Sequence, residues 1–296
     1  MKIRSDNAAA YRLGIDAGGT SCRARLTDAS GRPLGEGTAG AANIGLGVAT
    51  SQAAILQATH HALKQAGLPD AALARIDAGL GLAGANVPRL REAFERSPLP
   101  FRTTAILSDA EVACLGAHHG TDGGILILGT GSQGVVHRNG RFDTVGGWGF
   151  AASDSGSGAV LGRAAVRRSL LAHEGVEASS RMTAEVMERF SHDPATLAEW
   201  AAAAKPGDWG RFAPLVFEHA ALGDEVAQQL VISSAAAAER MLDRMMLLGA
   251  RRICLMGGVA QATRRYMSSR FDSVLQAPQG DAMDGALLLA ASIAQA

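Results

Sequence analysis

The sequence predicts an α/β fold built from two similar halves, because one pattern occurs twice and strands alternate with helices elsewhere. In residues 13–32, alternating apolar residues predict a strand, a glycine loop and a second strand. In residues 124–145 the same order returns as a short apolar run, a Gly/Thr loop and a hairpin with an Asn-Gly turn. The alternation of strand-like and helix-like segments favours mixed sheets covered by helices.

The remaining elements follow from periodicity and from start and stop signals. In the first half we expect a helix ending at Gly67, a strand over 76–82, a helix from an Asn86 cap to about Ser97, a strand over 104–107 and a helix over 111–118. In the second half we expect helices over 158–173, 182–190, 194–203 and 224–248, a strand over 252–256 and a closing helix over 281–296. No Pro/Ser-rich linker separates the halves. We therefore expect two tightly apposed lobes, 1–117 and 118–296, with the last helix packing back towards the N-terminal lobe.

Composition excludes several classes of protein. The 28 basic and 28 acidic residues balance, so no electrostatic footprint for nucleic acid or an anionic membrane is present. No stretch of 18 apolar residues occurs and the N-terminus lacks a signal-peptide core, which predicts a cytoplasmic protein. Cys22, Cys114 and Cys254 are far apart in sequence. Their spacing argues against disulfides, zinc and iron–sulfur clusters, and we expect buried thiols.

The two glycine loops are candidate phosphate-binding sites. Glycine removes the side chain that would hold a phosphate away from backbone N–H groups, and hydroxyl side chains add donors. The candidate residues are Gly18, Gly19 and Thr20 in the first loop and Gly129, Thr130, Gly131 and Ser132 in the second. Asp16 ends a buried strand beside the first loop, where a carboxylate suits a hydrated Mg²⁺. One such loop alone would equally be a tight turn, but the pair predicts ATP held between two lobes.

Asp109 is the candidate catalytic residue. It follows an apolar strand and Ser108 and precedes a helix. Polar groups just past the carboxyl ends of strands face the ligand crevice in open α/β sheets. A general base that accepts a proton from a sugar hydroxyl needs this placement. Alternatively, Ser108 or Asp109 is simply the N-cap of the helix.

Further positions suit a sugar and a nucleoside. Trp148 lies among glycines ahead of Asp154, and a ring beside a carboxylate suits the apolar face and the hydroxyls of a sugar. The alternative is a Trp packed on its own domain and a cap for the next helix. Asn43 would bond a sugar hydroxyl or occupy a turn. Gly257 and Gly258 follow a strand and open a helix, where backbone would approach adenosine closely, although this is also a common turn.

These motifs, in this order, resemble the N-acetylglucosamine/glucosamine kinase branch of the actin–hexokinase–Hsp70 ATPase superfamily. More broadly they resemble the bacterial BadF/BadG-type ATPase group, which includes activators of CoA-ester dehydratases and reductases. The resemblance covers nearly the whole chain through DAGGT (16–20), SDAEVA (108–113), LGTGS (128–132), GGWG with SDSGSG (146–158) and LMGGVA (255–260). It implies two ribonuclease-H-like lobes that close over substrate, and usually a homodimer.

The resemblance also implies the role of each motif. The glycine loops would bind phosphates, and Asp109 would take the proton from the 6-hydroxyl of the sugar. The amino sugar would be held by Asn43, Trp148 and Asp154, and the adenosine flanked by Gly257 and Gly258. The family commonly has glutamate where this chain has Ser155, which leaves glucosamine, N-acetylglucosamine, a muramic-acid derivative and another hexose open.

The sequence therefore predicts an ATP-dependent kinase that phosphorylates the 6-hydroxyl of an amino sugar. One alternative is the activator ATPase of a CoA-ester dehydratase or reductase, which needs a pair of cluster-binding cysteines that this chain does not convincingly supply. The other is a non-catalytic sugar-sensing protein of the same fold.

Overall fold

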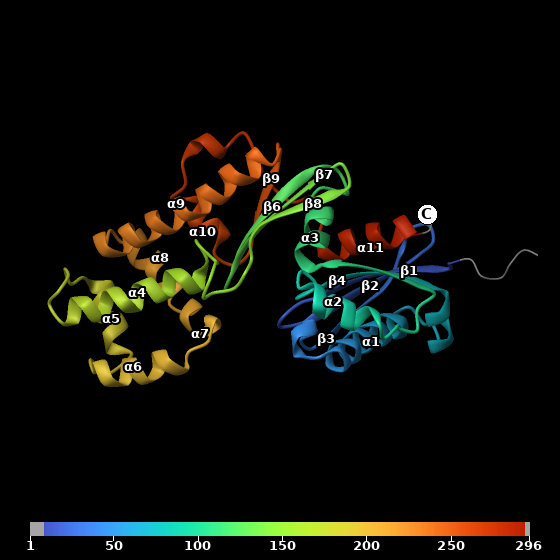
Figure 1. Cartoon of the computed structure of the whole chain (residues 1–296), viewed down its shortest axis with the longest axis horizontal. Coiled ribbons are helices and arrows are strands. Elements are labelled where there is room, and N and C mark those ends of the chain that lie inside the picture. The colour runs from blue at the N-terminus through green and yellow to red at the C-terminus, as the bar shows by residue number, and fades with distance from the viewer. Residues whose placement is uncertain (1–8, 294–296) are drawn as a thin grey trace, which may run out of the picture. The chain divides into compact units, whose positions relative to one another are not determined.

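The computed structural model describes residues 9–293, which form two compact units (Figure 1). The first unit contains the chain up to residue 123 together with residues 137–142 and the C-terminal segment from residue 277. The second unit contains residues 124–136 and 143–276. The chain thus enters the second unit, returns briefly to the first through a hairpin tip, and returns again at its end.

The first unit is built on a five-stranded mixed sheet with the strand order β3-β2-β1-β4-β5. Its strands are β1 (Tyr11–Ala17), β2 (Cys22–Asp28), β3 (Pro33–Ala39), β4 (Ile76–Leu82) and β5 (Thr103–Ser108). The first three strands pair antiparallel, whereas β1, β4 and β5 run parallel. The helices are η1 (Ile44–Leu46), α1 (Val48–Gln65), η2 (Asp70–Arg75), α2 (Pro88–Glu95), α3 (Asp109–Ala117) and α11 (Ala282–Ile293).

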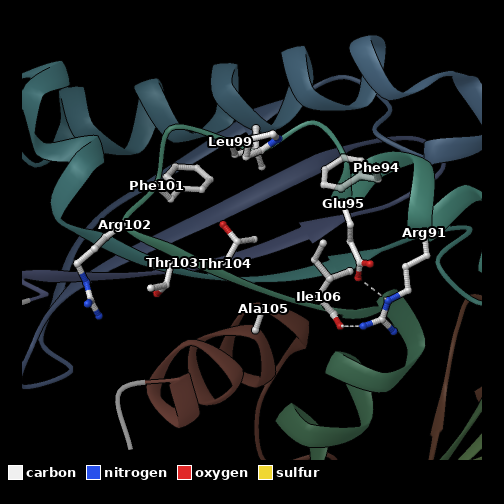
Figure 2. A pocket seen from close by; sticks show the side chains of 11 residues that line it. Arg91, Phe94, Glu95, Leu99, Phe101, Arg102, Thr103, Thr104, Ala105 and Ile106 are labelled. Atoms are coloured by element: carbon white, nitrogen blue, oxygen red, sulfur yellow. Dashed lines mark hydrogen bonds and ion pairs between the residues drawn. The ribbon is translucent and has the colours of Figure 1, made fainter. Parts of the chain in front are cut away.

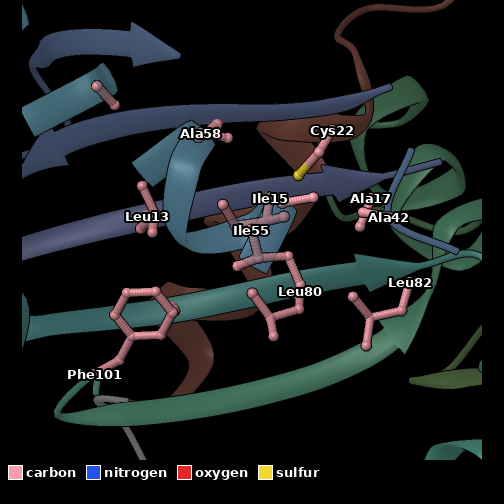
Figure 3. Close-up of a cluster of buried hydrophobic side chains, with 14 of the residues drawn as sticks. Leu13, Ile15, Ala17, Cys22, Ala42, Ile55, Ala58, Leu80, Leu82 and Phe101 are labelled. Carbon is pink, nitrogen blue, oxygen red and sulfur yellow. The ribbon is translucent and has the colours of Figure 1, made fainter. Parts of the chain in front are cut away.

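Small residues let helices pack very closely on this sheet. Helix α1 covers β3 and β2, and α11 contacts β1, β4 and α3. A Cβ atom at Gly79 of β4 would lie 1.9 Å from the carbonyl oxygen of Ala286 in α11, so glycine is required there. The core between the sheet and α1 contains the fully buried side chains of Leu13, Ile15 and Leu80 (Figure 3). Burial of each such side chain contributes roughly 1.5–3 kcal/mol to stability.

The second unit repeats the topology of the first. Its sheet has the order β10-β9-β6-β7-β8, and β6, β9 and β10 run parallel. The strands are β6 (Gly123–Leu128), β7 (Ser132–Arg138), β8 (Arg141–Gly146), β9 (Ile253–Met256) and β10 (Leu275–Gln276). In both sheets the first strand is central, with a hairpin on one side and two parallel strands on the other. This equivalence confirms the predicted α/β fold of two similar halves.

Most helices of the second unit lie between β8 and β9 in the chain. They are α4 (Gly158–His173), α5 (Arg181–Glu188), α6 (Pro194–Ala203), α7 (Pro206–Gly210), α8 (Ala213–Ala221) and α9 (Glu225–Leu247), followed by α10 (Ala260–Arg264) and η3 (Ser269–Phe271). An apolar core with the aromatic residues Phe190, Trp200, Trp209 and Phe212 joins α4, α5, α6, α7, α8 and the beginning of α9. None of the helices over residues 9–293 combines the length and apolar character that crossing a membrane requires.

Several local expectations need correction. Helix α2 begins at Pro88 with Val87 as its N-cap, so Asn86 does not cap it. The sequence patterns did not predict α7, α8, β3 or β10. The three cysteines are buried, as expected. Of the closing helix predicted over 281–296, the structure describes α11 up to Ile293, and the last three residues lie outside the described part of the chain.

Candidate functional site

The first glycine loop is the turn of the β1–β2 hairpin. Its base is closed by a hydrogen bond from the backbone N–H of Gly18 to the carbonyl of Ser21, at 2.9 Å. The carbonyl of Gly18 accepts from the N–H of Ala42, at 3.0 Å. Gly19 and Thr20, between these anchors, are exposed, and no atom lies within 4 Å of the position a Cβ would occupy at Gly19. The loop is therefore anchored at its base and open at its tip, as binding a phosphate requires.

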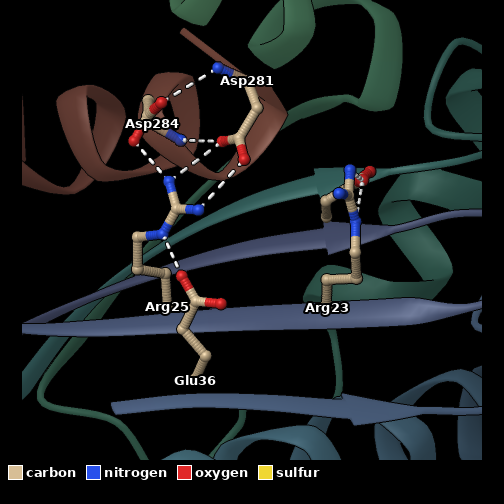
Figure 4. A network of polar contacts seen from close by, with 6 residues as sticks. Arg23, Arg25, Glu36, Asp281 and Asp284 are labelled. Carbon is tan, nitrogen blue, oxygen red and sulfur yellow. Dashed lines mark hydrogen bonds and ion pairs between the residues drawn. The ribbon is translucent and has the colours of Figure 1, made fainter. Parts of the chain in front are cut away.

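Asp16 precedes this loop and is bound by an arginine that the sequence patterns did not single out. Asp16 of β1 and Arg23 of β2 are partners in the hairpin register. The Nε and Nη2 atoms of Arg23 donate to Oδ2 of Asp16 at 3.1 and 2.6 Å (Figure 4). The Asp16 side chain is 17% exposed and that of Arg23 43%, so the arginine side chain is partly open to solvent. Hairpin register was the signal that could have found this pair.

Asp109 is the first residue of α3, at the same edge of the sheet. The register aligns Ala17, Leu82 and Ser108 at the ends of β1, β4 and β5. Ser108 is the N-cap: its hydroxyl accepts from the N–H of Glu111, whose carboxylate accepts from the N–H of Ser108. Ser108 thus fills the capping role, and Asp109 is not the cap.

The carboxylate of Asp109 is electrostatically unusual. Burial raises the pKa of Asp109, and the nearby charge of Asp16 raises it further. A hydrogen bond from the N–H of Ala110 to Oδ1 of Asp109, at 2.9 Å, lowers the pKa but does not cancel the rise. A carboxylate with a raised pKa at the carboxyl edge of parallel strands is a candidate general base.

Asn43 lies at this edge as well. Its Oδ1 accepts from the N–H of Gly45 at 2.7 Å and caps η1. A Cβ at Gly84, in the turn after β4, would lie 3.0 Å from that Oδ1. The side-chain N–H groups of Asn43 have no acceptor among residues 9–293. The first unit therefore brings together Asp16, the first loop, Asn43 and Asp109.

The second glycine loop joins β6 to β7 and contacts the beginning of α4. The N–H of Gly129 donates to the carbonyl of Gly131 at 2.9 Å. The N–H groups of Gly158 and Ala159 donate to the carbonyls of Gly129 and Thr130, at 2.8 and 3.2 Å. The first turn of α4 thereby fixes the backbone of the loop.

Asp154 lies against this loop. It is only 7% exposed, and the nearby backbone N–H of Ser132 favours its charged form. A Cβ at Gly131 would lie 2.9 Å from Oδ2 of Asp154. Burial raises the pKa of Asp154. The N-cap of α4 is Ser157, whose Oγ accepts from Val160, so neither Asp154 nor Ser155 has the capping role.

The turn after β9 reaches the same end of the second sheet. Gly257 has a φ of +99°, and a Cβ there would lie 2.4 Å from the carbonyl oxygen of Leu128. The N–H of Val259 donates to that carbonyl at 3.1 Å. Gly258 is exposed with open space around it. The second unit therefore brings together the second loop, Asp154, Gly257 and Gly258.

Trp148 lies in the glycine-rich segment after β8, in the same unit. Its side chain is 68% exposed, so it does not pack into a core. Gly147 and Gly149 on either side have φ angles of +79° and +90°. These conformations are freely available only to glycine and set the direction of the segment.

A hollow elsewhere in the first unit is distinct from these residues. It has a volume of about 590 Å³ and lies between α2 and the edge strand β5 (Figure 2). Phe94, Phe101 and Ile106 line it, and Arg91 donates to the carbonyl of Ile106 at 2.9 Å. None of the candidate site residues lines this hollow. Within residues 9–293 no cluster of three or more His, Cys, Asp or Glu side chains suits a metal ion.

Comparison with known proteins gives a consistent result. The sequence model of the BadF/BadG/BcrA/BcrD ATPase family matches residues 13–290. The glucosamine kinase GspK of Vibrio cholerae is 40% identical over 280 residues, which cover 95% of each chain. An N-acetyl-D-glucosamine kinase of Dictyostelium discoideum is 28% identical over 239 residues, 75% of each chain. The crystal structure of a candidate N-acetylglucosamine kinase from Chromobacterium violaceum superimposes with a TM-score of 0.87 at 35% identity, covering 95% of this chain and 99% of the other.

Proposed function

Because the chain belongs to the BadF/BadG/BcrA/BcrD ATPase family, we propose that it is an ATP-dependent kinase for the 6-hydroxyl of an amino sugar. The 40% identity to a glucosamine kinase over 95% of both chains supports this substrate class. The single structural observation that carries the proposal is Asp109, a carboxylate of raised pKa beside an open glycine loop.

ATP would be held by backbone donors of both glycine loops and by the turn at Gly257 and Gly258. Arg23, whose side chain is partly exposed beside the first loop, adds a positive charge that suits a phosphate oxygen. Mg²⁺ commonly keeps several waters and binds one or two carboxylates together with substrate phosphates. Asp16 fits that role through a bridging water, since only its Oδ2 is engaged by Arg23. A bound Mg²⁺ would supply neutralisation of phosphate charge.

Asp109 would act on the acceptor. As the hydroxyl oxygen bonds to the γ-phosphorus and the bond to ADP breaks, the hydroxyl proton passes to the carboxylate of Asp109. General-base assistance of this kind is typically worth about 10²–10⁴-fold in rate. Asn43, Trp148 and Asp154 would hold a sugar such as glucosamine or N-acetylglucosamine. The contact of Asp154 with Ser132 would link sugar binding to the second phosphate loop.

The activator function is less compatible with the cysteines. All three are buried, and burial together with the charge of Asp16 raises the pKa of Cys22 to about 12. Such thiols are poor ligands for a cluster shared between subunits. We further propose a homodimer, as the family resemblance implies, and a cytoplasmic location, as the composition predicts; light scattering of the purified protein tests the dimer.

A coupled assay of ADP release over a panel of hexoses and amino sugars tests the proposal. We expect turnover with glucosamine or N-acetylglucosamine, and a loss of about 10²–10⁴-fold in the Asp109→Asn variant with ATP binding retained. Asp143→Asn, which changes an exposed carboxylate of β8, is the matched control. Release of ADP that no sugar stimulates would contradict the kinase, and full turnover in Asp109→Asn would contradict the choice of base.

A further inference from the structure

One face of α4 forms a groove rich in arginine. The groove has a volume of about 300 Å³. Positions 160, 163, 164, 167, 168 and 171 line it, and this three-and-four spacing places them on one side of the helix. Glu177 and Leu230 complete the wall. All of these residues belong to the second unit, and none is part of the glycine loops.

The positive charge in this groove exceeds its negative charge. Arg168 forms an ion pair with Glu177. Arg163 lies over the ring of Phe150, with its guanidinium carbon 4.6 Å from the ring centroid. Arg167 is exposed and has no acidic partner among residues 9–293. Like charges four positions apart on a helix repel each other. The spacing of Arg163 and Arg167 therefore lowers the stability of α4 unless an anion lies between the two side chains.

A second observation points to a missing acceptor. In the part of the chain that the structure describes, the Nε atom of Arg168 is buried without a hydrogen-bond acceptor, and Oε2 of its ion-pair partner Glu177 is buried without a hydrogen-bond donor. Buried donors are nearly always paired in native proteins. Arg168 and Glu177 both line the groove, so their ion pair leaves hydrogen-bonding capacity unused in its wall.

We propose that this groove binds a small phosphate-bearing anion at a site separate from the two glycine loops. Guanidinium groups match phosphate oxygens in geometry and charge, often through two parallel hydrogen bonds. The groove also has apolar surface that suits the organic group of a phosphate ester, from Val160, Leu171 and Leu230. The volume lies at the lower end of the range for small-molecule pockets.

The position of the groove gives an occupant a direct connection to the candidate nucleotide site. Helix α4 begins with the N–H groups of Gly158 and Ala159 that fix the second loop. Phe150, on which Arg163 stacks, directly follows the glycine segment around Trp148. Binding in the groove itself does not depend on the proposed kinase activity.

Isothermal titration of inorganic pyrophosphate and of glucosamine 6-phosphate, at constant ionic strength, tests the proposal. The proteins are the wild type, Gly131→Val, Arg163→Gln/Arg167→Gln and the charge-matched control Arg251→Gln/Arg265→Gln, whose arginines are exposed elsewhere in the second unit. We expect Gly131→Val to keep one binding site, the groove, and the control to keep the groove site together with the intact glycine loops. Binding at the groove site should weaken at least about tenfold in the groove variant, as expected for loss of charged hydrogen bonds.

The design separates the possible results. Binding lost in Gly131→Val but unchanged in the groove variant would overturn the proposal, because the glycine loop would be the only anion site. Equal weakening in the control would overturn it as well, because net charge alone would explain the effect. Circular dichroism checks folding, and Arg163→Lys/Arg167→Lys, which keeps the charge, should retain measurable binding.

Discussion

Asp16 and Asp109 lie at the same edge of the first sheet, and the charge of Asp16 adds to burial in raising the pKa of Asp109. A base works only when deprotonated, so kcat/KM should fall as the pH drops through this raised pKa. The acid limb of the profile should therefore lie above the pH expected for an ordinary aspartate, about 3.9.

The Asp16→Asn variant tests this relationship. Removing the neighbouring charge should move the acid limb of kcat/KM to lower pH, whatever happens to the maximum rate. The measurement is a pH profile of kcat/KM for the sugar in both proteins at saturating ATP. An acid limb that does not move would show that Asp109 is not the titrating base, or that burial alone sets its pKa.

The ion pair between Arg23 and Asp16 makes a second prediction. If the partly exposed Arg23 side chain also contacts a phosphate, Arg23→Gln should weaken ADP binding by about tenfold, the value of one charge-assisted hydrogen bond. Arg12→Gln changes an arginine on the same sheet, near the opposite end of β1, and should leave ADP binding unchanged. Calorimetric titration with ADP measures both. Equal affinities for ADP in the two variants would show that Arg23 binds Asp16 and does not contact a phosphate.

Much of this fold could be predicted because its elements carry clear local signals. The strand over 76–82 and the helices over 158–173 and 194–203 have the predicted bounds. Side-chain caps at Ser157 and Asp193 mark the starts of the two helices. Helix α8 was missed because it follows Phe212 with no side-chain cap. The strand β10 has only two residues, too few to show a period.

The candidate site could be predicted only in part, for a related reason. Chain order shows that Asp109 follows a strand, and parallel strands end at one edge. It does not show that Arg23 pairs with Asp16, since this depends on the register of the hairpin. Nor does it show that Asp154 contacts Gly131 and Ser132, because a folded loop brings these residues together.

The adjacent glycines Gly257 and Gly258 provide a matched pair for a third prediction. Gly257→Ala should lower the free energy of unfolding by about 1–3 kcal/mol, because alanine is strained at a φ of +99° and its Cβ would collide with the carbonyl of Leu128. Gly258→Ala places its Cβ in open space and should be nearly neutral. Denaturant unfolding of both variants measures the difference. Similar stabilities would show that the β9–α10 turn does not need a left-handed residue.

Arg25 of β2 forms ion pairs with three carboxylates (Figure 4). Glu36 belongs to the neighbouring strand β3, whereas Asp281 and Asp284 lie at the beginning of α11, so Arg25 joins this helix to the first sheet. Its side chain is 20% exposed, so the cluster is only partly screened by solvent. Arg25→Gln would leave the acids unpaired and should lower the free energy of unfolding by about 1–3 kcal/mol at neutral pH. Arg32→Gln, which removes an exposed ion pair with Asp28, should have a smaller effect.

The pH dependence of this loss gives the sharper test. Burial by itself would raise the pKa of Asp281. The N–H of Asp284 and the Arg25 guanidinium outweigh this effect and hold the pKa of Asp281 below its usual value. A carboxylate whose pKa is lowered by folding stabilises the folded state above its unfolded pKa of about 3.9, and this contribution disappears as the pH falls through the folded value. The difference in unfolding free energy between wild type and Arg25→Gln should therefore be largest near pH 7 and shrink below pH of about 4. A difference that stays constant from neutral to acidic pH would mean that Arg25 stabilises α11 through packing of its aliphatic stem instead.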